Sequence, residues 1–524
     1  MKRIGQLGVI GMIVAAFFLS MMAIVPAEAK NKQELVAFMV QVPRHFNGAV
    51  QSGSATMIPS SQLFASPLLF DDKWNPQPYL AKSWKVADDG LSVTLNLVEG
   101  ATFHDGKPIT SADVAFSIMT IKKNHPFKSM FAPVEKVDTP DPQTAVLRLS
   151  KPHPAILLAL SQALCPIIPK HIFDDGQDIK THPMNLKPVG SGPFKFVEYK
   201  PGEHLILEAY DKFFLGAPKL DRIIIKIIRD PVNRLVSLER KECSMNLQAN
   251  STLDIKRSQK LAHLKVEPTG DAVSPLFWLA FNTQRGVLKD KRVRQAISFA
   301  IDRDFITKRL LSGFTKRSTG PIFPGSPFYS ADVEPYHVDL DKARALLDEA
   351  GHKKGADGKR FPLTIDYIPA GTDFKAVSEY LKAQLKKIGI DAMLRTSADF
   401  PTWIKQVAGW DFDMTLDSVW GWGDPVIGVH RTYLTSNIRK GVPWSNTQRY
   451  SNPKVDDLLA RAAVEMDTAK RKALYAEFQK IVVDDAPIAY INTFPFYIIY
   501  DKGLKNVNTT IWGTMSPMHE VYWE

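Results

Sequence analysis

The residues best suited to chemistry lie in residues 409–425, with the sequence GWDFDMTLDSVWGWGDP. A strand-like run at 412–416 is followed by Trp420, Gly421, Trp422, Gly423 and Asp424. Tryptophan offers a large flat apolar face, and glycine lets the backbone approach a bound molecule closely. Asp424 can accept hydrogen bonds from a cation, and no catalytic group stands beside it in the sequence. We interpret the segment as a ligand-holding loop; the alternative is that the two tryptophans simply cap a core.

The elements before this loop predict where it lies. Residues 363–367 alternate as in a strand, 374–388 have apolar residues at helical spacing, and 390–394, 400–407 and 412–416 indicate a strand, a helix and a strand. This alternation predicts right-handed crossovers and a parallel sheet. Ligands of open α/β sheets bind beyond the carboxyl ends of the strands, which is where the loop follows its strand.

The amino-terminal residues 1–29 have the pattern of a secretory signal. Lys2 and Arg3 precede an apolar run at 7–25, and Ala27 and Ala29 form a small-residue cleavage site. The apolar run is also long enough for an uncleaved membrane anchor. No cysteine follows it, so we expect a cleaved periplasmic protein without a lipid anchor.

Composition excludes several classes of protein. The net charge of +11 is spread along the chain, without a Lys/Arg-rich run interleaved with aromatic residues, so we expect no nucleic-acid partner. The twelve histidines are scattered, with none at H-x-x-x-H spacing, so we expect no metal site and no cofactor. Cys165 and Cys243 could form a disulfide or remain two buried thiols.

Two loops are interpreted as structural. His104 belongs to a His-Asp-Gly-Lys turn before a helix, whose start at Thr110 and Asp113 has the spacing of a capping box. The run Gly190-Ser191-Gly192-Pro193 could suggest a phosphate cradle, but Pro193 lacks a backbone donor and no Lys-Ser/Thr follows.

Four separated stretches resemble one known family. They are 78–118 (PYLAKSWKVADDGLSVTLNLVEGATFHDGKPITSADVAFSI), 190–214 (GSGPFKFVEYKPGEHLILEAYDKFF), 281–304 (FNTQRGVLKDKRVRQAISFAIDRD) and 450–462 (YSNPKVDDLLARA). In this order they resemble the family 5 extracellular solute-binding proteins of bacterial ABC importers, the peptide, nickel and opine group. The resemblance covers nearly all of residues 30–524.

The resemblance implies an α/β bilobal periplasmic-binding-protein-like fold of type II (cluster C). It implies mixed sheets, a discontinuous first domain and a hinge of two crossings, near Asn282 and Pro487. The implied domains are domain I at 30–70, 187–275 and 486–524, domain II at 71–186, and domain III at 276–485.

The resemblance also implies a function. We expect a monomeric, non-enzymatic receptor that captures an oligopeptide or peptide-like solute between its lobes and delivers it to ABC permease subunits. In peptide-binding members an aspartate after a Gly-Trp pair holds the peptide amine; Asp424 corresponds to that acid or to a later structural acid preceding proline. The expected ligand-binding residues are Gln51, Ser52, Trp278, Trp420, Trp422, Asp424, Arg431, Asn492 and Phe494.

Other functions stay open at this point. Metal-chelate (nickel-type), opine and oligosaccharide receptors share the scaffold, so the fold does not identify the solute. An exported hydrolase is the main rival class, but the sequence has no convincing G-x-S-x-G, H-E-x-x-H or S-x-x-K set.

Overall fold

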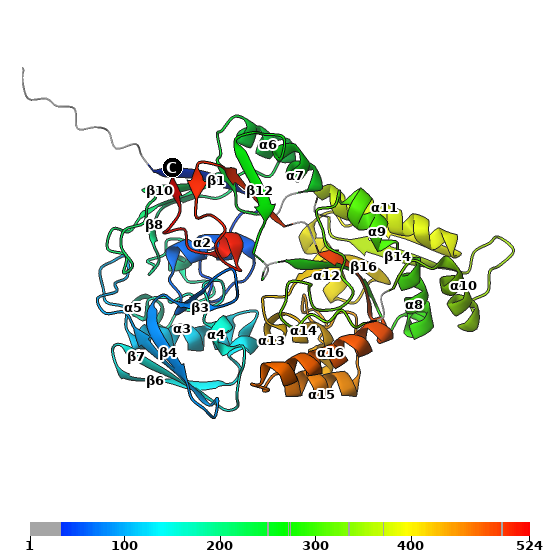
Figure 1. The fold of residues 1–524 in the computed structure, drawn as a ribbon, viewed down its shortest axis with the longest axis horizontal. Helices are drawn as coiled ribbons and strands as arrows, with labels where there is room; N and C mark the ends of the chain where they lie inside the picture. Colours follow the sequence, from blue (N-terminus) through cyan, green and yellow to red (C-terminus); the bar gives the residue numbers. More distant parts are fainter. Residues whose placement is uncertain are drawn as a thin grey trace, which may run out of the picture.

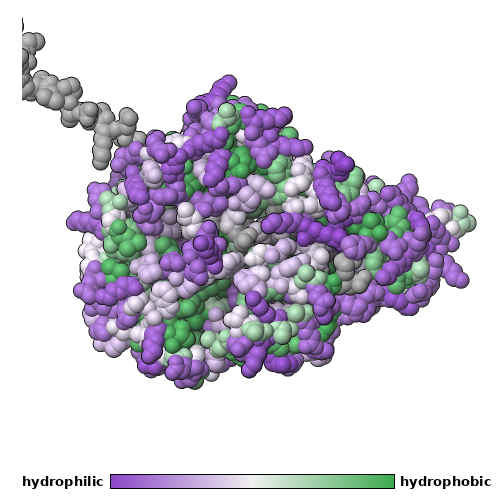
Figure 2. Space-filling model, viewed as in Figure 1, coloured by the Kyte–Doolittle hydropathy of each residue, from purple (hydrophilic) through white to green (hydrophobic). Residues whose placement is uncertain are grey.

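The computed structural model describes residues 33–248, 251–270, 272, 274–333, 336–369, 371–493 and 496–524, and these ranges fold into two lobes that lie side by side (Figure 1). The expected signal at 1–29 lies outside the described residues. None of the helices within these ranges is long and apolar enough to span a membrane. Hydrophilic residues cover most of the face shown in Figure 2.

The first lobe is built on a large mixed sheet, which we call the first-lobe sheet. Its described strands, in spatial order, are β12 (Leu264–Pro268), β18 (Tyr497–Asp501), β11 (Met245–Asn246), β1 (Glu34–Met39), β10 (Arg222–Ile227), β9 (His204–Ala209) and β8 (Phe194–Lys200). β10 has the sequence RIIIKI, and its residues alternate between half-buried and buried, as in a strand with one face on a core.

An antiparallel sheet completes the first lobe below the large one (Figure 1). Its strands run in the order β4 (Ala81–Val86), β5 (Ser92–Leu97), β7 (Thr144–Leu149) and β6 (Val134–Asp141). Two short described pairs accompany the main sheets, β2 (Leu68–Phe70) with β3 (Pro76–Pro78) and β19 (Leu504–Lys505) with β20 (Tyr522–Trp523).

The second lobe contains the predicted strand-helix alternation. Its sheet has the described order β15 (Ile390–Arg395), β14 (Phe361–Tyr367), β16 (Met414–Trp420), β13 (Pro275–Phe281) and β17 (Ile488–Thr493). β14 pairs in parallel with both β15 and β16, which confirms the predicted parallel arrangement. β13 and β17 are antiparallel additions, and every residue of β13 is buried.

The strand pairing shows that the chain crosses between the lobes at other positions than expected. β13 and β17 pair with each other in the second lobe, so the chain crosses before Pro275 and after Thr493. The expectation of crossings near Asn282 and Pro487 is therefore wrong. The consecutive strands β17 and β18 belong to different lobes, because β17 joins the second-lobe sheet whereas β18 joins the first-lobe sheet.

Helices cover these sheets, and short polar side chains define where many of them begin. Asp290, Asp399 and Asp467 each accept a backbone hydrogen bond at the start of a second-lobe helix. In the first lobe the helices are α2 (Ser54–Leu63), α3 (Ser111–Asn124), α4 (Ile156–Ala159), α5 (Lys170–Phe173), α6 (Pro231–Glu239) and α7 (Thr252–Ser258). In the second lobe they are α8 (Lys291–Ala300), α9 (Arg303–Phe305), α10 (Leu340–Glu349), α11 (Gly371–Lys387), α12 (Phe400–Ala408), α13 (Pro425–Gly428), α14 (His430–Tyr433), α15 (Pro453–Ala462) and α16 (Thr468–Asp485).

The two loops interpreted as structural contact each other in the first lobe. His104 Nε2 lies 2.9 Å from the Gly192 carbonyl oxygen, and the Gly190 N–H donates to His104 Nδ1 at 3.0 Å. Burial lowers the pKa of His104 to about 4, so the ring is neutral. The predicted capping box of α3 is also present, with Asp113 accepting from both the N–H and the hydroxyl of Thr110.

Position 190 requires glycine because its backbone packs closely against the backbone of Leu63. A Cβ atom at position 190 would lie 1.8 Å from the Leu63 carbonyl oxygen, which is backbone and cannot rotate away. We therefore expect Gly190→Ala to lower the free energy of unfolding by about 1–3 kcal/mol, the usual cost of overpacking. Gly320→Ala is the matched control, since its Cβ would meet nothing closer than 3.6 Å. Urea denaturation followed by circular dichroism measures both; equal stability of the two variants would contradict the prediction.

Candidate functional site

The two lobes touch at several points, so the structure has a closed junction. The Phe127 and Trp422 ring centroids are 4.7 Å apart, and those of Trp74 and Phe323 are 6.5 Å apart. The backbone N–H and the hydroxyl of Thr252 donate to the buried Asp373 carboxylate at 3.1 and 3.0 Å. These contacts join segments of different lobes.

The loop singled out by the sequence lies at this junction. β16 ends at Trp420, and the chain then turns sharply through Trp422 (φ 48°) and Gly423 (φ 79°) before α13. A Cβ on Gly423 would lie 2.7 Å from Leu158 Cδ2 of the first lobe. Glycine suits this position because its φ of 79° is one that residues with side chains rarely adopt. α4, which contains Leu158, lies beside α13 in Figure 1.

The carboxylate of Asp424 is already paired with groups of the protein itself. Its two carboxylate oxygens accept hydrogen bonds from Arg471 of α16, both at 2.7 Å, and one of them also accepts from the Val426 N–H at the start of α13. Burial opposes ionisation, but the attraction of Arg471 and these hydrogen bonds outweigh it, so the pKa of Asp424 lies below its ordinary value. This corrects the expectation that its charge is available to a ligand cation: Asp424 has the other role considered for it, a structural acid before proline.

A different carboxylate, Asp417, remains without a cationic contact partner among the described residues. It lies on β16 directly opposite Trp278 of β13 and is 6% exposed. Burial raises the pKa of Asp417 to about 7, although a hydrogen bond from the Ser418 N–H and the attraction of Arg431 favour its charged form. Sequence reasoning missed this residue; the signal was an acid inside a strand, MTLDSVW, that has no other charged residue.

Arg431 is the second charged group at the junction. It is a residue of α14, and its guanidinium carbon lies 4.7 Å from the ring centroid of Phe127 in the first lobe. Its Nε donates to the Gly428 carbonyl oxygen at 3.2 Å, and it forms no ion pair with any described carboxylate. Burial lowers its pKa to about 10, while the attraction of Asp417 raises it. Asp417 and Arg431 therefore each shift the pKa of the other, although the two side chains form no ion pair.

Buried polar atoms of two expected site residues also lack partners. The Trp278 indole N–H and both amide atoms of Asn492 make no hydrogen bond within the described part of the chain. Trp278 neighbours Asp417, and Asn492 lies on β17, opposite Phe277. Buried polar groups normally have partners, so these atoms are candidates to bind a guest.

The remaining expected residues lie on both sides of the junction or outside the description. Gln51 and Ser52 are half-buried residues of the first lobe before α2. Gln51 adjoins His125, whose pKa burial lowers to about 3, although the Gln51 backbone partly opposes that shift. Trp420 is half-buried and its ring lies next to that of Phe496. Trp422 is buried and its ring lies next to that of Phe127. Phe494 lies outside the described residues.

The described residues contain neither a disulfide between the two cysteines nor a metal site. Cys165 and Cys243 are separate buried thiols, so the disulfide alternative is wrong. No group of three His, Cys, Asp or Glu side chains within the described ranges is arranged to hold a metal ion.

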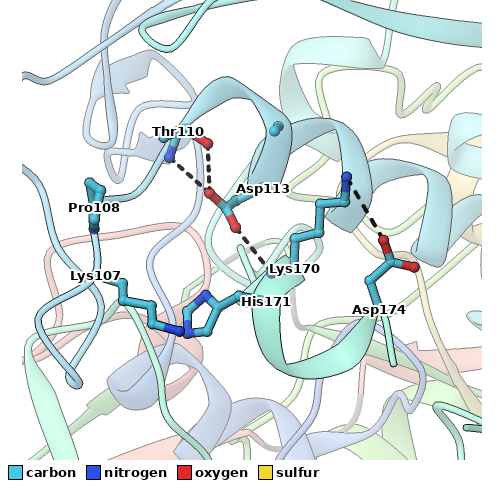
Figure 3. Close-up of a pocket in the computed structure, with 8 residues that line it drawn as sticks. Lys107, Pro108, Thr110, Asp113, Lys170, His171 and Asp174 are labelled. Atoms are coloured by element: carbon cyan, nitrogen blue, oxygen red, sulfur yellow. Dashed lines mark hydrogen bonds and ion pairs between the residues drawn. The ribbon is translucent and has the colours of Figure 1, made fainter. Parts of the chain in front are cut away.

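A pocket of about 410 Å³ lies on the first lobe between α3 and α5 (Figure 3). Its polar groups already have partners: Asp113 accepts from Thr110 and from the Lys170 N–H, His171 lies 2.8 Å from Asp105, and Lys170 lies 3.8 Å from Asp174. This pocket is a structural corner between α3 and α5.

Residues 75–440 match the middle region of the bacterial extracellular solute-binding proteins, family 5. The chain belongs to this family. Members of this solute-binding family are extracellular or periplasmic transport proteins, and the bilobal α/β fold expected from the resemblance is confirmed by the solved structures that are similar to this one.

Three comparisons show how similar this family 5 protein is to known members. It is 28% identical to the oligopeptide-binding protein AppA of Bacillus subtilis over 87% of the chain and 86% of the relative. The crystal structure of NikZ from Campylobacter jejuni in complex with Ni(L-His) has a TM-score of 0.84 at 25% identity, covering 94% of this chain and 99% of that one. The structure of B. subtilis AppA in complex with a nonapeptide has a TM-score of 0.81 at 26% identity, covering 94% and 99%.

The different surroundings of the two acids predict that replacing each by asparagine changes stability by a different amount. Asp424→Asn leaves Arg471 buried without its counter-charge, so we expect the free energy of unfolding to fall by about 3–5 kcal/mol. Asp417→Asn removes a buried carboxylate that has no contacting cation, so we expect no loss of stability at pH 7. Chemical denaturation of both variants tests this; an Asp424→Asn variant as stable as Asp417→Asn would contradict it.

Asp417 also predicts a dependence of stability on pH. Its folded pKa, about 7, is above its ordinary value of 3.8, so between these pH values the folded state keeps a proton that the unfolded state has lost. The contribution of Asp417 to stability is therefore complete below pH 4 and falls by about 1.4 kcal/mol per pH unit up to about pH 7.

Asp417→Asn removes this titration. The free energy of unfolding of the wild type, minus that of the variant, is expected to decrease from pH 5 to pH 7 and then to level off. Denaturation curves at several pH values measure it, and a difference independent of pH would place Asp417 in a more polar environment than the structure shows.

Proposed function

We propose that this family 5 protein captures an oligopeptide or peptide-like solute between its lobes and delivers it to the permease of an ABC importer. The observation that carries this proposal is the pair Asp417 and Arg431, two opposite charges that do not contact each other. Asp417 is buried, and Arg431 is half-buried against Phe127 of the first lobe. A peptide with free ends has the matching ammonium and carboxylate groups.

The chemistry of each group suits one part of such a solute. Asp417 would accept hydrogen bonds from the peptide ammonium, and Arg431 would donate to the carboxylate, in bidentate geometry where its orientation permits. The unpartnered Trp278 N–H and Asn492 amide would pair with peptide carbonyl and N–H groups. Gln51, Ser52, Trp420 and Trp422 are proposed to surround these anchors.

Closure of the lobes would provide the capture step. The two crossings, between β12 and β13 and between β17 and β18, are the proposed hinge. We propose domains I, II and III as expected above, with residues 488–493 assigned to domain III. A ligand shifts the open and closed populations only by its difference in affinity for them, so groups that reach it only after closure matter most.

The relatives support this class of solute and one alternative. B. subtilis AppA is named for oligopeptide binding, and its structure holds a nonapeptide. NikZ holds Ni(L-His), so a metal chelate that presents an amino-acid carboxylate to Arg431 is the second candidate. Both are small charged molecules that a cation and an anion can orient.

The remaining properties are part of the same proposal. We infer export to the periplasm through cleavage of residues 1–29, no lipid anchor, action as a monomer with permease subunits, and no nucleic-acid partner. We infer binding without catalysis, since transport requires release of an unaltered solute.

Native mass spectrometry of residues 30–524, followed by fragmentation of any released molecule, tests the proposal. A peptide at one copy per chain would support it, and nickel with an amino-acid chelator would select the alternative. Titration with peptide pools follows if the protein is empty; failure of every peptide to bind or to raise the melting temperature would overturn it.

Asp417→Asn is expected to weaken the binding of a peptide by about 10–100-fold, because a hydrogen bond to a charged group contributes about 1.5–3 kcal/mol. Wild-type binding at pH 6 should also release a proton, since the ammonium favours ionised Asp417. Isothermal titration calorimetry in buffers of different ionisation enthalpy measures both effects. Asp304→Asn, which alters an exposed carboxylate of α9 paired with Lys308, is the control; equal affinities of the two variants would remove Asp417 from the site.

A further inference from the structure

An exposed apolar patch lies on the second lobe, where the start of α12 meets the loop at 437–446. Phe400 is 38% exposed, Val442 40% and Trp444 36%. The rings of Phe400 and Trp444 are stacked, with their centroids 5.9 Å apart and an angle of 28° between their planes. Single exposed apolar residues are common on protein surfaces, whereas a group of them indicates an interaction site. We call these three residues the apolar patch.

Hydrogen bonds hold the loop at 437–446 in place. The Gly441 N–H donates to the Ala408 carbonyl oxygen at the end of α12, at 2.8 Å. The Asn446 side chain donates to the carbonyl oxygens of Leu434 and Tyr450, at 3.1 and 2.7 Å. The exposed side chains of the loop are therefore carried by a backbone that is attached both to α12 and to the flanking chain.

The backbone at Trp444 indicates that its exposure serves a purpose other than folding. Its φ of 49° lies in the left-handed region, which bulky residues rarely adopt and which costs free energy. Trp422 has nearly the same φ, 48°, but is 4% exposed, so the contacts of a buried ring compensate for its conformation. Trp444 lacks that degree of burial. A strained backbone at an exposed aromatic residue favours a role in binding.

Cationic side chains border the apolar patch. Arg439 and Lys440 are exposed in the same loop, and Lys405 is exposed on α12. None of these three forms an ion pair with a carboxylate in the described part of the chain. The Lys440 ammonium nitrogen and the Arg449 guanidinium carbon lie 5.9 and 4.6 Å from the ring centroid of Trp410. Aromatic and cationic groups therefore alternate over this part of the surface.

The acids nearby do not neutralise these cations. The Asp399 carboxylate accepts a hydrogen bond from the Thr402 N–H, at 2.8 Å, and so begins α12. Asp411 lies 3.3 Å from both Arg285 and Arg395, so its charge is already paired. The patch therefore has more unpaired positive than negative charge around it.

This combination of residues suits a lipid surface better than a protein surface. Lysine is depleted in protein–protein interfaces, and a stable interface takes about 20–30 residues from each partner. Tryptophan, in contrast, is enriched at the level of the lipid headgroups. Lys and Arg beside such aromatic residues are attracted to anionic lipids. The charge of the border and the aromatic character of the patch therefore point to the same partner.

We propose that Phe400, Val442 and Trp444, together with Arg439 and Lys440, form a surface that binds reversibly to membranes containing anionic phospholipids. The rings would lie at the level of the headgroups, and the two cations would contact lipid phosphates. Such binding would keep the protein beside a membrane without a spanning helix or a lipid anchor. It does not depend on which solute the protein carries.

Co-sedimentation of residues 30–524 with lipid vesicles tests the inference. We expect binding to vesicles of phosphatidylethanolamine with about one quarter phosphatidylglycerol, and none to vesicles of phosphatidylcholine alone. Because salt screens the attraction, the affinity should fall at least about tenfold at about 1 M salt, where the Debye length is about 3 Å.

Charge reversal tests the basic border. The double variant Arg439→Glu and Lys440→Glu is expected to lower the affinity for anionic vesicles by at least about tenfold, since each cation near the membrane contributes to the attraction. Lys353→Glu with Lys354→Glu is the matched control, because it makes the same change in net charge on another exposed loop of the second lobe. This control is expected to bind as the wild type does.

Trp444→Asn tests the apolar patch. Asparagine tolerates the left-handed backbone, so this variant should fold. We expect it to bind anionic vesicles at least about fivefold more weakly and to lose most of the fluorescence quenching that bromine-labelled lipid causes in the wild type. Leu215→Ser, which changes a side chain that is 48% exposed on the first lobe, is the control and should alter neither result.

Three results would overturn the inference. The first is a wild type that binds neither kind of vesicle, and the second is an equal loss of binding in the two charge-reversal variants, which would reduce the effect to net charge. The third is a dimer, seen by sedimentation velocity without lipid and dissociated by Trp444→Asn, which would assign the patch to a second copy of the chain. The proposed function would stand in each case, because solute binding is measured without vesicles.

Discussion

The buried ion pair between Asp424 and Arg471 is the interaction on which the rest of the site depends. It joins the loop after β16 to α16, and the same carboxylate begins α13. The positions of Trp422, before this acid, and of Arg431, after it, both follow from that attachment. Two desolvated charges are tolerated here because each carboxylate oxygen has its own guanidinium donor.

Because Arg471 neutralises Asp424, the charges that can interact with a ligand are those of neighbouring residues. Had Arg471 been absent, Asp424 would be the strongest acid at the junction and the natural partner of a ligand cation. With Arg471 present, Asp417 still has no contacting cation, and Arg431 has no ion-pair partner among the described carboxylates. Burial disfavours both charges, so a solute with both signs of charge would offset the free-energy cost of desolvating them.

Aromatic contacts give the junction its shape. Phe127 packs against Trp422 and Arg431, and Trp74 stacks on Phe323, so each contact joins the two lobes. The hydrogen bonds from Thr252 to Asp373 join the lobes at another point. The space left for a solute is therefore decided by side chains from distant parts of the sequence.

The sequence by itself determined the parallel βαβαβ unit, the capping box of α3, the structural loop at Gly190 and the family, since each depends on local periodicity, local hydrogen bonding or ordered motifs. It also located the loop at 420–424. Only the tertiary structure decided what that loop does: Arg471 lies 47 residues from Asp424, and Phe127 belongs to the other lobe. A residue's charge and shape are local properties, but whether its charge is neutralised and its surface covered depends on which distant residues the fold places against it.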